Sequence, residues 1–105
     1  MSSMHERIQI RVLDDVVCVA PAGDLDLVTA PALRAALEEA VRLGPSRVVL
    51  TLRDVTFLDS TALGAIVHGS RIAEDQGRVL RLTDAAPPIR RVLTVTGMDD
   101  LLDGT

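Results

Sequence analysis

The chain has 105 residues, of which 48% are hydrophobic and one is aromatic, and its formal net charge is −4 at pH 7. This length fits one small domain with an apolar core, and the acidic balance argues against direct nucleic-acid binding, which needs basic side chains and, for single strands, aromatic stacking. No apolar run approaches the roughly 20 residues of a membrane span, and no signal-peptide pattern opens the chain, so we expect one cytoplasmic domain over residues 1–105 with a mobile tail at 1–5.

The first predicted elements are two strands. Apolar and polar side chains alternate over residues 6–13, which is typical of a half-buried strand. After an Asp-Asp turn, the apolar residues 16–20 return as a second strand, so we expect a hairpin. Pro21, Gly23 and Asp24 are expected to end the second strand, because residues of these types interrupt regular pairing.

A helix is predicted next. Thr29 is its expected N-cap, and Pro31 lies in the first turn, where the missing N–H of proline costs little. Apolar residues recur at helical spacing from Leu33 to Val41, and charged residues occupy the other face. Gly44 then ends the helix.

The rest of the chain alternates strands and helices: a strand over 47–52, a helix over about 61–75, a strand over 78–83, a helix that begins at Pro87-Pro88 and ends at Gly97, and one short turn within 98–102. The predicted order is β-β-α-β-α-β-α, which indicates an α/β fold with a mixed sheet, packed helices and right-handed crossovers. The strand at 47–52 is nearly continuous in apolar residues, so we expect it at the centre of the sheet with both faces covered.

The junction Asp59-Ser60-Thr61 is the most informative motif of the chain. It follows the apolar strand and opens the second long helix. The first turn of a helix presents unpaired N–H groups and a positive dipole end, which favour negative charge, including phosphate. From the residues alone two interpretations stay open: Asp59 or Ser60 is a helix cap worth about 1 kcal/mol, or a hydroxyl here is a regulated group.

Catalytic chemistry is not supported by the remaining residues. His68 is the histidine nearest to Thr61 in sequence, but seven helical residues separate them by about 10.5 Å of rise, too far for a general base. No nucleophile elbow or glycine-rich phosphate loop is present. All eleven basic residues are arginine, so the lysine that a receiver domain needs near its phosphoaspartate is missing. We therefore expect a protein that is not an enzyme.

A metal site is conceivable at the acidic residues. Asp24, Asp26 and Asp59 offer the oxygen ligands that Mg²⁺ prefers. Aspartates at turns and caps more commonly bond nearby backbone, so we expect no metal and no cofactor of the chain's own.

Three segments lie in the order and spacing of one known family: Gly23–Asp26 with Thr29–Arg34, Val48–Leu52 with Phe57–Gly64, and Ile89–Leu93 with Thr96–Met98. On these segments the chain resembles the bacterial anti-sigma factor antagonists of the STAS domain family, and the likeness runs from the first strand to about Leu102. The resemblance implies a STAS-like mixed sheet packed with helices.

The family carries the motif D-S-[ST]-G-L at a helix start, and a partner kinase phosphorylates its second hydroxyl residue. The resemblance places the phosphoacceptor at Thr61, with Ser60 as the alternative, and puts Asp26 close to it. Thr61 stands where serine is commoner. Ala62 stands where the family has glycine, so it adds a Cβ at the expected docking surface.

The resemblance also implies a partner surface and its occupants. The expected surface residues are Asp24, Asp26, Asp59, Ser60, Ala62, Leu63 and Gly64, with His68 at the edge. The unphosphorylated protein would bind an anti-sigma factor serine/threonine kinase of the GHKL type, which holds the ATP and Mg²⁺, and so release the sigma factor. Phosphorylation at Thr61 would end that complex, and a PP2C-type phosphatase would reset it.

Two alternatives remain open. In one, the chain is a STAS scaffold subunit of a larger assembly, such as a lipid-transport ABC complex or a stress-signalling particle, and Thr61 is a contact or cap. In the weaker one, the domain binds a nucleotide directly.

Overall fold

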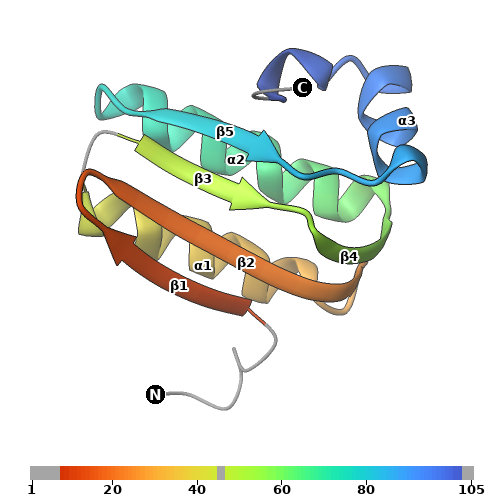
Figure 1. The fold of residues 1–105 in the computed structure, drawn as a ribbon, viewed down its shortest axis with the longest axis horizontal. Helices are drawn as coiled ribbons and strands as arrows, with labels where there is room; N and C mark the ends of the chain where they lie inside the picture. The colour runs from red at the N-terminus through yellow and green to blue at the C-terminus, as the bar shows by residue number, and fades with distance from the viewer. Residues whose placement is uncertain (1–7, 45–46, 103–105) are drawn as a thin grey trace.

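A computed structural model of the chain describes residues 8–44 and 47–102, in which a mixed sheet carries two long helices on one face (Figure 1). The expected tail at 1–5 lies outside the described residues. In chain order the elements are β1 (Ile8–Leu13), β2 (Val16–Leu25), α1 (Ala30–Leu43), β3 (Arg47–Thr51), β4 (Asp54–Leu58), α2 (Ser60–Asp75), β5 (Val79–Thr83), α3 (Pro87–Val95) and the short 3-10 helix η2 (Asp99–Leu101).

The predicted mixed α/β fold is confirmed, and the structure adds one strand to the predicted order. Strand β4 lies between β3 and α2, where the sequence suggested only a junction. Its side chains do not alternate between buried and exposed: Val55 and Leu58 are buried, while Thr56 and Phe57 between them are exposed. The strand is short, and its burial does not follow the period of two that sequence patterns are read for.

The sheet has the order β1-β2-β3-β5, and β4 pairs with β2 beside this path. Strand β1 is antiparallel to β2, and the other pairs are parallel. Figure 1 shows α1 and α2 side by side behind the sheet, and α3 beyond the C-terminal end of β5, next to β4.

Strand β2 does not end near Pro21 as expected but runs on to Leu25. Its pairing with β3 stops at Val19 and its pairing with β4 starts at Ala22, so on this edge Pro21 lies between the two partners, while on the other edge it is opposite Ile8 of β1. Gly23 has φ of +86°, a conformation that favours glycine, and the register with β4 shifts just after it. Proline and glycine here mark a change of partner within one strand.

The core lies between the sheet and the two long helices. Leu33 and Leu37 of α1 and Ile66 of α2 are fully buried against it. Along β3 the buried Val48 and Leu50 alternate with half-buried residues. The expectation that this strand is covered alike on both faces is therefore wrong, because α1 and α2 lie on the same face (Figure 1).

Helices α1 and α2 approach each other closely at Gly69. A Cβ atom built on Gly69 would lie 2.8 Å from Cδ1 and 3.1 Å from Cβ of Leu37, closer than side chains normally pack. Because Leu37 is fully buried, it has little room to move. Gly64, on the same helix, is exposed and has no atom within 4 Å of a built Cβ. No helix of the described segments is long and apolar enough to cross a membrane.

These two glycines give a matched test of the packing. Alanine favours helix over glycine by about 1 kcal/mol, so we expect Gly64→Ala to raise the free energy of unfolding by up to that amount. In Gly69→Ala the same gain is outweighed by overpacking of about 1–3 kcal/mol, so the net change should be a loss. Urea denaturation of both variants measures the difference. Equal stabilisation by the two substitutions would contradict the close packing at Leu37.

Candidate functional site

The candidate site lies where β2 and β4 end and α2 begins. Because the two strands are parallel, with Leu25 opposite Leu58, their carboxyl ends meet at one edge of the sheet. The backbone N–H of Asp59 donates to the carbonyl oxygen of Leu25 at 3.1 Å. The loop after β2 is thereby held beside the first turn of α2, so two segments more than thirty residues apart in the chain meet at this edge.

Asp59 is the cap of α2. It has an extended backbone, and its Oδ1 accepts a hydrogen bond from the N–H of Ala62 at 3.0 Å. Of the two capping candidates in the sequence, the structure thus selects Asp59. Ser60 and Thr61 are the first two residues of the helix, and both are exposed.

The loop after β2 is fixed by Asp26 and Thr29. Oδ1 of Asp26 accepts from the N–H groups of Val28 at 3.0 Å and Thr29 at 3.2 Å, which is an Asx-type turn. The Thr29 hydroxyl accepts from the N–H of Asp26 at 2.8 Å and donates to the carbonyl oxygen of Asp24 at 3.0 Å. Thr29 does hold the N-cap position of α1, but it makes no side-chain cap bond, because its hydroxyl binds the preceding loop instead.

Asp24 is anchored to the strand that the sequence did not predict. The hydroxyl of Thr56 on β4 donates to Oδ1 of Asp24 at 2.7 Å. Thr56 was missed because β4 was missed. Within residues 8–44 and 47–102, no three His, Cys, Asp or Glu side chains are grouped so that they could hold a metal ion.

A groove runs between the N-terminal halves of α1 and α2. It has a volume of about 360 Å³ and is lined by Leu27, Ala30, Pro31, Arg34, Thr61, Gly64 and Ala65. The side chain of Leu27, at the rim of this groove, is 71% exposed, and that of its neighbour Val28 is 83% exposed. Sequence reasoning missed both, although two successive apolar residues in a loop bounded by Asp26 and Thr29 were a usable signal, because no helical or strand period accounts for them.

Two residues expected on the partner surface lie instead in the core. Ala62 is fully buried and Leu63 is buried, and both pack in the main hydrophobic cluster. With Asp59 as the cap, the helix faces the sheet with residues 62, 63 and 66, as the i, i+1, i+4 spacing requires. The Cβ of Ala62 therefore points inward, and the surface expected there is left to Ser60, Thr61 and Gly64.

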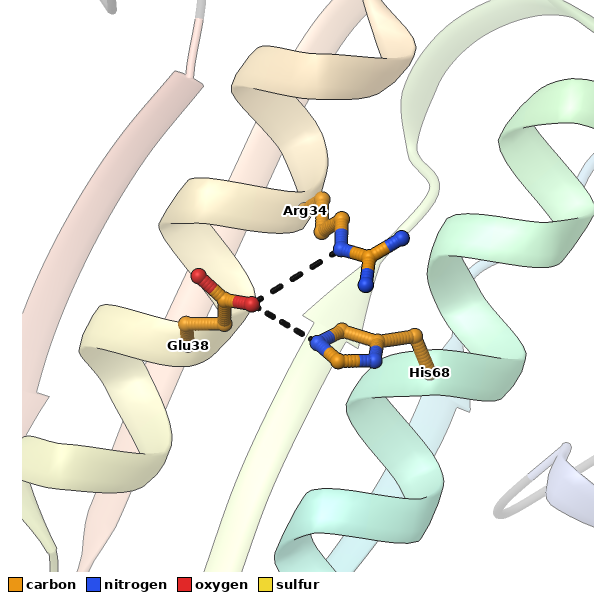
Figure 2. A network of polar contacts seen from close by, with 3 residues as sticks. All are labelled: Arg34, Glu38 and His68. Carbon is orange, nitrogen blue, oxygen red and sulfur yellow. Dashed lines mark hydrogen bonds and ion pairs between the residues drawn. The ribbon is translucent and has the colours of Figure 1, made fainter.

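His68 lies two turns beyond Thr61 and binds across to α1. Its Nε2 lies 2.7 Å from Oε2 of Glu38, and Nε of Arg34 lies 3.7 Å from the same oxygen. Figure 2 shows the imidazole and the guanidinium group next to each other between the two helices, both facing the same oxygen of this carboxylate. The sequence suggested an exposed histidine at the edge of the partner surface, but the ring is half-buried and paired with Glu38.

A family model described as "Mlab, STAS domain" matches residues 8–103. The curated relatives include the anti-sigma-B factor antagonist of Bacillus subtilis (strain 168), which is 29% identical over 100 residues that cover 95% of this chain and 91% of the relative.

Solved structures of the same fold include a protein described as an anti-sigma factor antagonist from Mycobacterium paratuberculosis. It has a TM-score of 0.77 and 27% identity, over 91% of this chain and 81% of that one. The anti-sigma factor antagonist SpoIIAA in its unphosphorylated form has a TM-score of 0.79 over 90% of this chain and 84% of its own, and at 21% identity it shows the fold alone. SpoIIAA of Bacillus is also known in a phosphorylated form, with a TM-score of 0.71 and 22% identity over 90% of this chain and 87% of that one.

The cap at Asp59 can be tested through stability. We expect Asp59→Ala to lower the free energy of unfolding by about 1 kcal/mol, because the N–H of Ala62 loses its acceptor. Asp59→Asn keeps a capping oxygen and should cost much less. Chemical denaturation of both variants measures the difference, and a loss of equal size in Asp59→Asn would show that charge rather than capping matters.

Proposed function

The chain belongs to the STAS domain family, and on this basis we propose that it is an anti-sigma factor antagonist. In its unphosphorylated form it binds an anti-sigma factor kinase and thereby releases the sigma factor. Phosphorylation at Thr61 ends that complex. The names of the curated relatives support the role, since they are antagonists of anti-sigma factors and this chain covers nearly their whole length.

The observation that carries the proposal is the position of Thr61. Its side chain is exposed at the start of α2 and lines the groove, next to a loop with two exposed apolar residues. A kinase can therefore reach the hydroxyl while it contacts the loop. Ser60 is exposed beside it and is the alternative acceptor.

The chemistry at Thr61 belongs to the partner enzymes. A kinase of the GHKL type supplies ATP and Mg²⁺, the Thr61 oxygen forms a bond to the γ-phosphorus, and the bond from that phosphorus to ADP breaks. The hydroxyl proton passes to a base on the kinase. A PP2C-type phosphatase later transfers the phosphoryl group to water and restores the hydroxyl.

The phosphate acts on the complex through charge. It brings about −1.5 to −2 charges at neutral pH, and it stands at an edge that already carries Asp24, Asp26 and Asp59. Repulsion and desolvation then oppose a partner that bound the neutral hydroxyl. A loss of about 3 kcal/mol is enough to weaken the affinity more than a hundredfold.

A second candidate function keeps the fold but changes the partner. The matching family model is described with the name Mlab and not with that of an antagonist. In this alternative the domain is a STAS scaffold in an ABC lipid-transport or stress-signalling assembly, and Thr61 is a contact. A pull-down with the full chain distinguishes the two, because recovery of a transporter ATPase in place of an anti-sigma kinase would favour the scaffold.

The phosphoacceptor can be identified directly. Incubation with the cognate anti-sigma kinase and ATP should add one phosphate, and tandem mass spectrometry should place it on Thr61. Thr61→Ala should stay unmodified, whereas Ser60→Ala should be phosphorylated like the parent chain. If Thr61→Ala were phosphorylated at Ser60, Ser60 would be assigned as the acceptor. If the parent chain were not phosphorylated at all, the assignment of a kinase partner would be refuted.

The exposed apolar loop should anchor the kinase. We expect Leu27→Asp to weaken binding of the unphosphorylated protein by tenfold or more, about 1.4 kcal/mol, because it puts a charge in place of an apolar contact. Val95→Asp on α3 is the matched control, since Val95 is 79% exposed and lies outside the groove. Calorimetric titration with the kinase measures both, and equal losses would contradict a specific role for Leu27.

A further inference from the structure

The groove beside Thr61 contains one arginine whose position the proposed function does not use. Among the described residues that line the groove, Arg34 is the charged one; the others are apolar side chains, Gly64 and Thr61 itself. Arg34 comes from α1 and Thr61 from α2, so the cation and the hydroxyl line the same groove from separate helices.

We propose that Arg34 is the intramolecular partner of the phosphate on Thr61, and that it leaves Glu38 to bind it. This inference rests on phosphorylation of Thr61 and adds the residue that receives the phosphate. Arginine suits the role, because its planar guanidinium group offers parallel N–H donors that match two phosphate oxygens.

The present contact of Arg34 is weak enough to be exchanged. Its Nε lies 3.7 Å from Oε2 of Glu38, and the two side chains are 57% and 47% exposed. Ion pairs of this length and exposure add little to stability. The order Arg-to-Glu along the helix is also the less favourable one. A phosphate with about two negative charges offers Arg34 a stronger partner than this single carboxylate.

Glu38 does not lose its only partner in the exchange. Its Oε2 lies 2.7 Å from Nε2 of His68, a shorter contact than the one to Arg34. Figure 2 shows both side chains converging on the same carboxylate oxygen. When Arg34 turns toward Thr61, the contact between Glu38 and His68 can persist and keep α1 joined to α2.

The phosphate has few other ways to be neutralised at this site. The positive end of α2 is already occupied by the carboxylate of Asp59, which accepts the N–H of Ala62. Asp24 and Asp26 add negative charge on the adjoining loop. Among the described arginines, Arg34 is the one that lines the groove with Thr61, whereas Arg42 pairs with Glu39 and Arg53 lies 3.7 Å from Asp84.

The test uses the full chain with phosphothreonine incorporated at position 61 during translation, so that no kinase is needed. The second ionisation of the phosphate, near pH 6, is followed by ³¹P NMR. A cation beside the phosphate stabilises its dianion and lowers this pKa. Arg34→Gln should therefore raise the phosphate pKa by about 0.5 units or more, and Arg34→Lys should restore much of the difference.

Two further variants keep the result interpretable. Arg42→Gln removes an arginine from the same helix and should leave the phosphate pKa unchanged. Glu38→Gln removes the competing carboxylate and should leave it unchanged or lower it. The ring resonances of His68 should move on phosphorylation in the parent chain but not in Arg34→Gln, because only the parent loses Arg34 from the shared carboxylate.

Equal phosphate titrations for Arg34→Gln and Arg42→Gln would overturn the inference, as would a raised phosphate pKa in Glu38→Gln. Neither result depends on the kinase. Failure of the cognate kinase to modify Thr61 would refute the proposed function instead, while the titration of the translated phosphoprotein would still report on Arg34.

Discussion

Strand β2 pairs with β3 over its first half and with β4 over its second half, and the position of the site follows from the second pairing. Because β2 and β4 are parallel, their carboxyl ends reach the same edge, and the chain leaves them through the loop before α1 and through the cap of α2. At the change of partner, Pro21 lies between the pairings with β3 and β4, and Gly23 has a positive φ next to the register shift. Without this pairing the acidic loop and Thr61 would have no reason to lie together.

The three aspartates of the site all serve as parts of the scaffold. Asp24 accepts from Thr56, Asp26 holds its own loop, and Asp59 caps α2. Their carboxylates are thus held in place by local bonds before any partner arrives. Because these three negative charges are already fixed in position, no side chain has to move before they repel a further anion such as a phosphate.

How far the sequence could predict this structure depended on whether a signal was local. The stripe from Leu33 to Val41 has helical period, and α1 buries it as expected. Strand β4 could not be found in this way, because the irregular register at Gly23 leaves Val55 and Leu58 buried at a spacing of three.

In the candidate site, too, the sequence indicated the local features but not those set by contacts between distant segments. The motif located Asp59 and Thr61, but the rotation of α2 that buries Ala62 is set by the cap and the core. His68 and Glu38 are thirty residues apart in the sequence and lie on different helices, so the helical period of either segment gives no sign of their contact.

Asp59 joins two elements with two different groups: its N–H binds the end of β2, and its side chain binds the start of α2. A fluctuation that frees one bond also loosens the residue that makes the other. The loop after β2 and the first turn of α2 should therefore open and close as one cooperative unit, with similar free energies of local opening for their backbone amides. The backbone amide hydrogens of the site should then exchange with solvent together, while those of the sheet behind it stay protected.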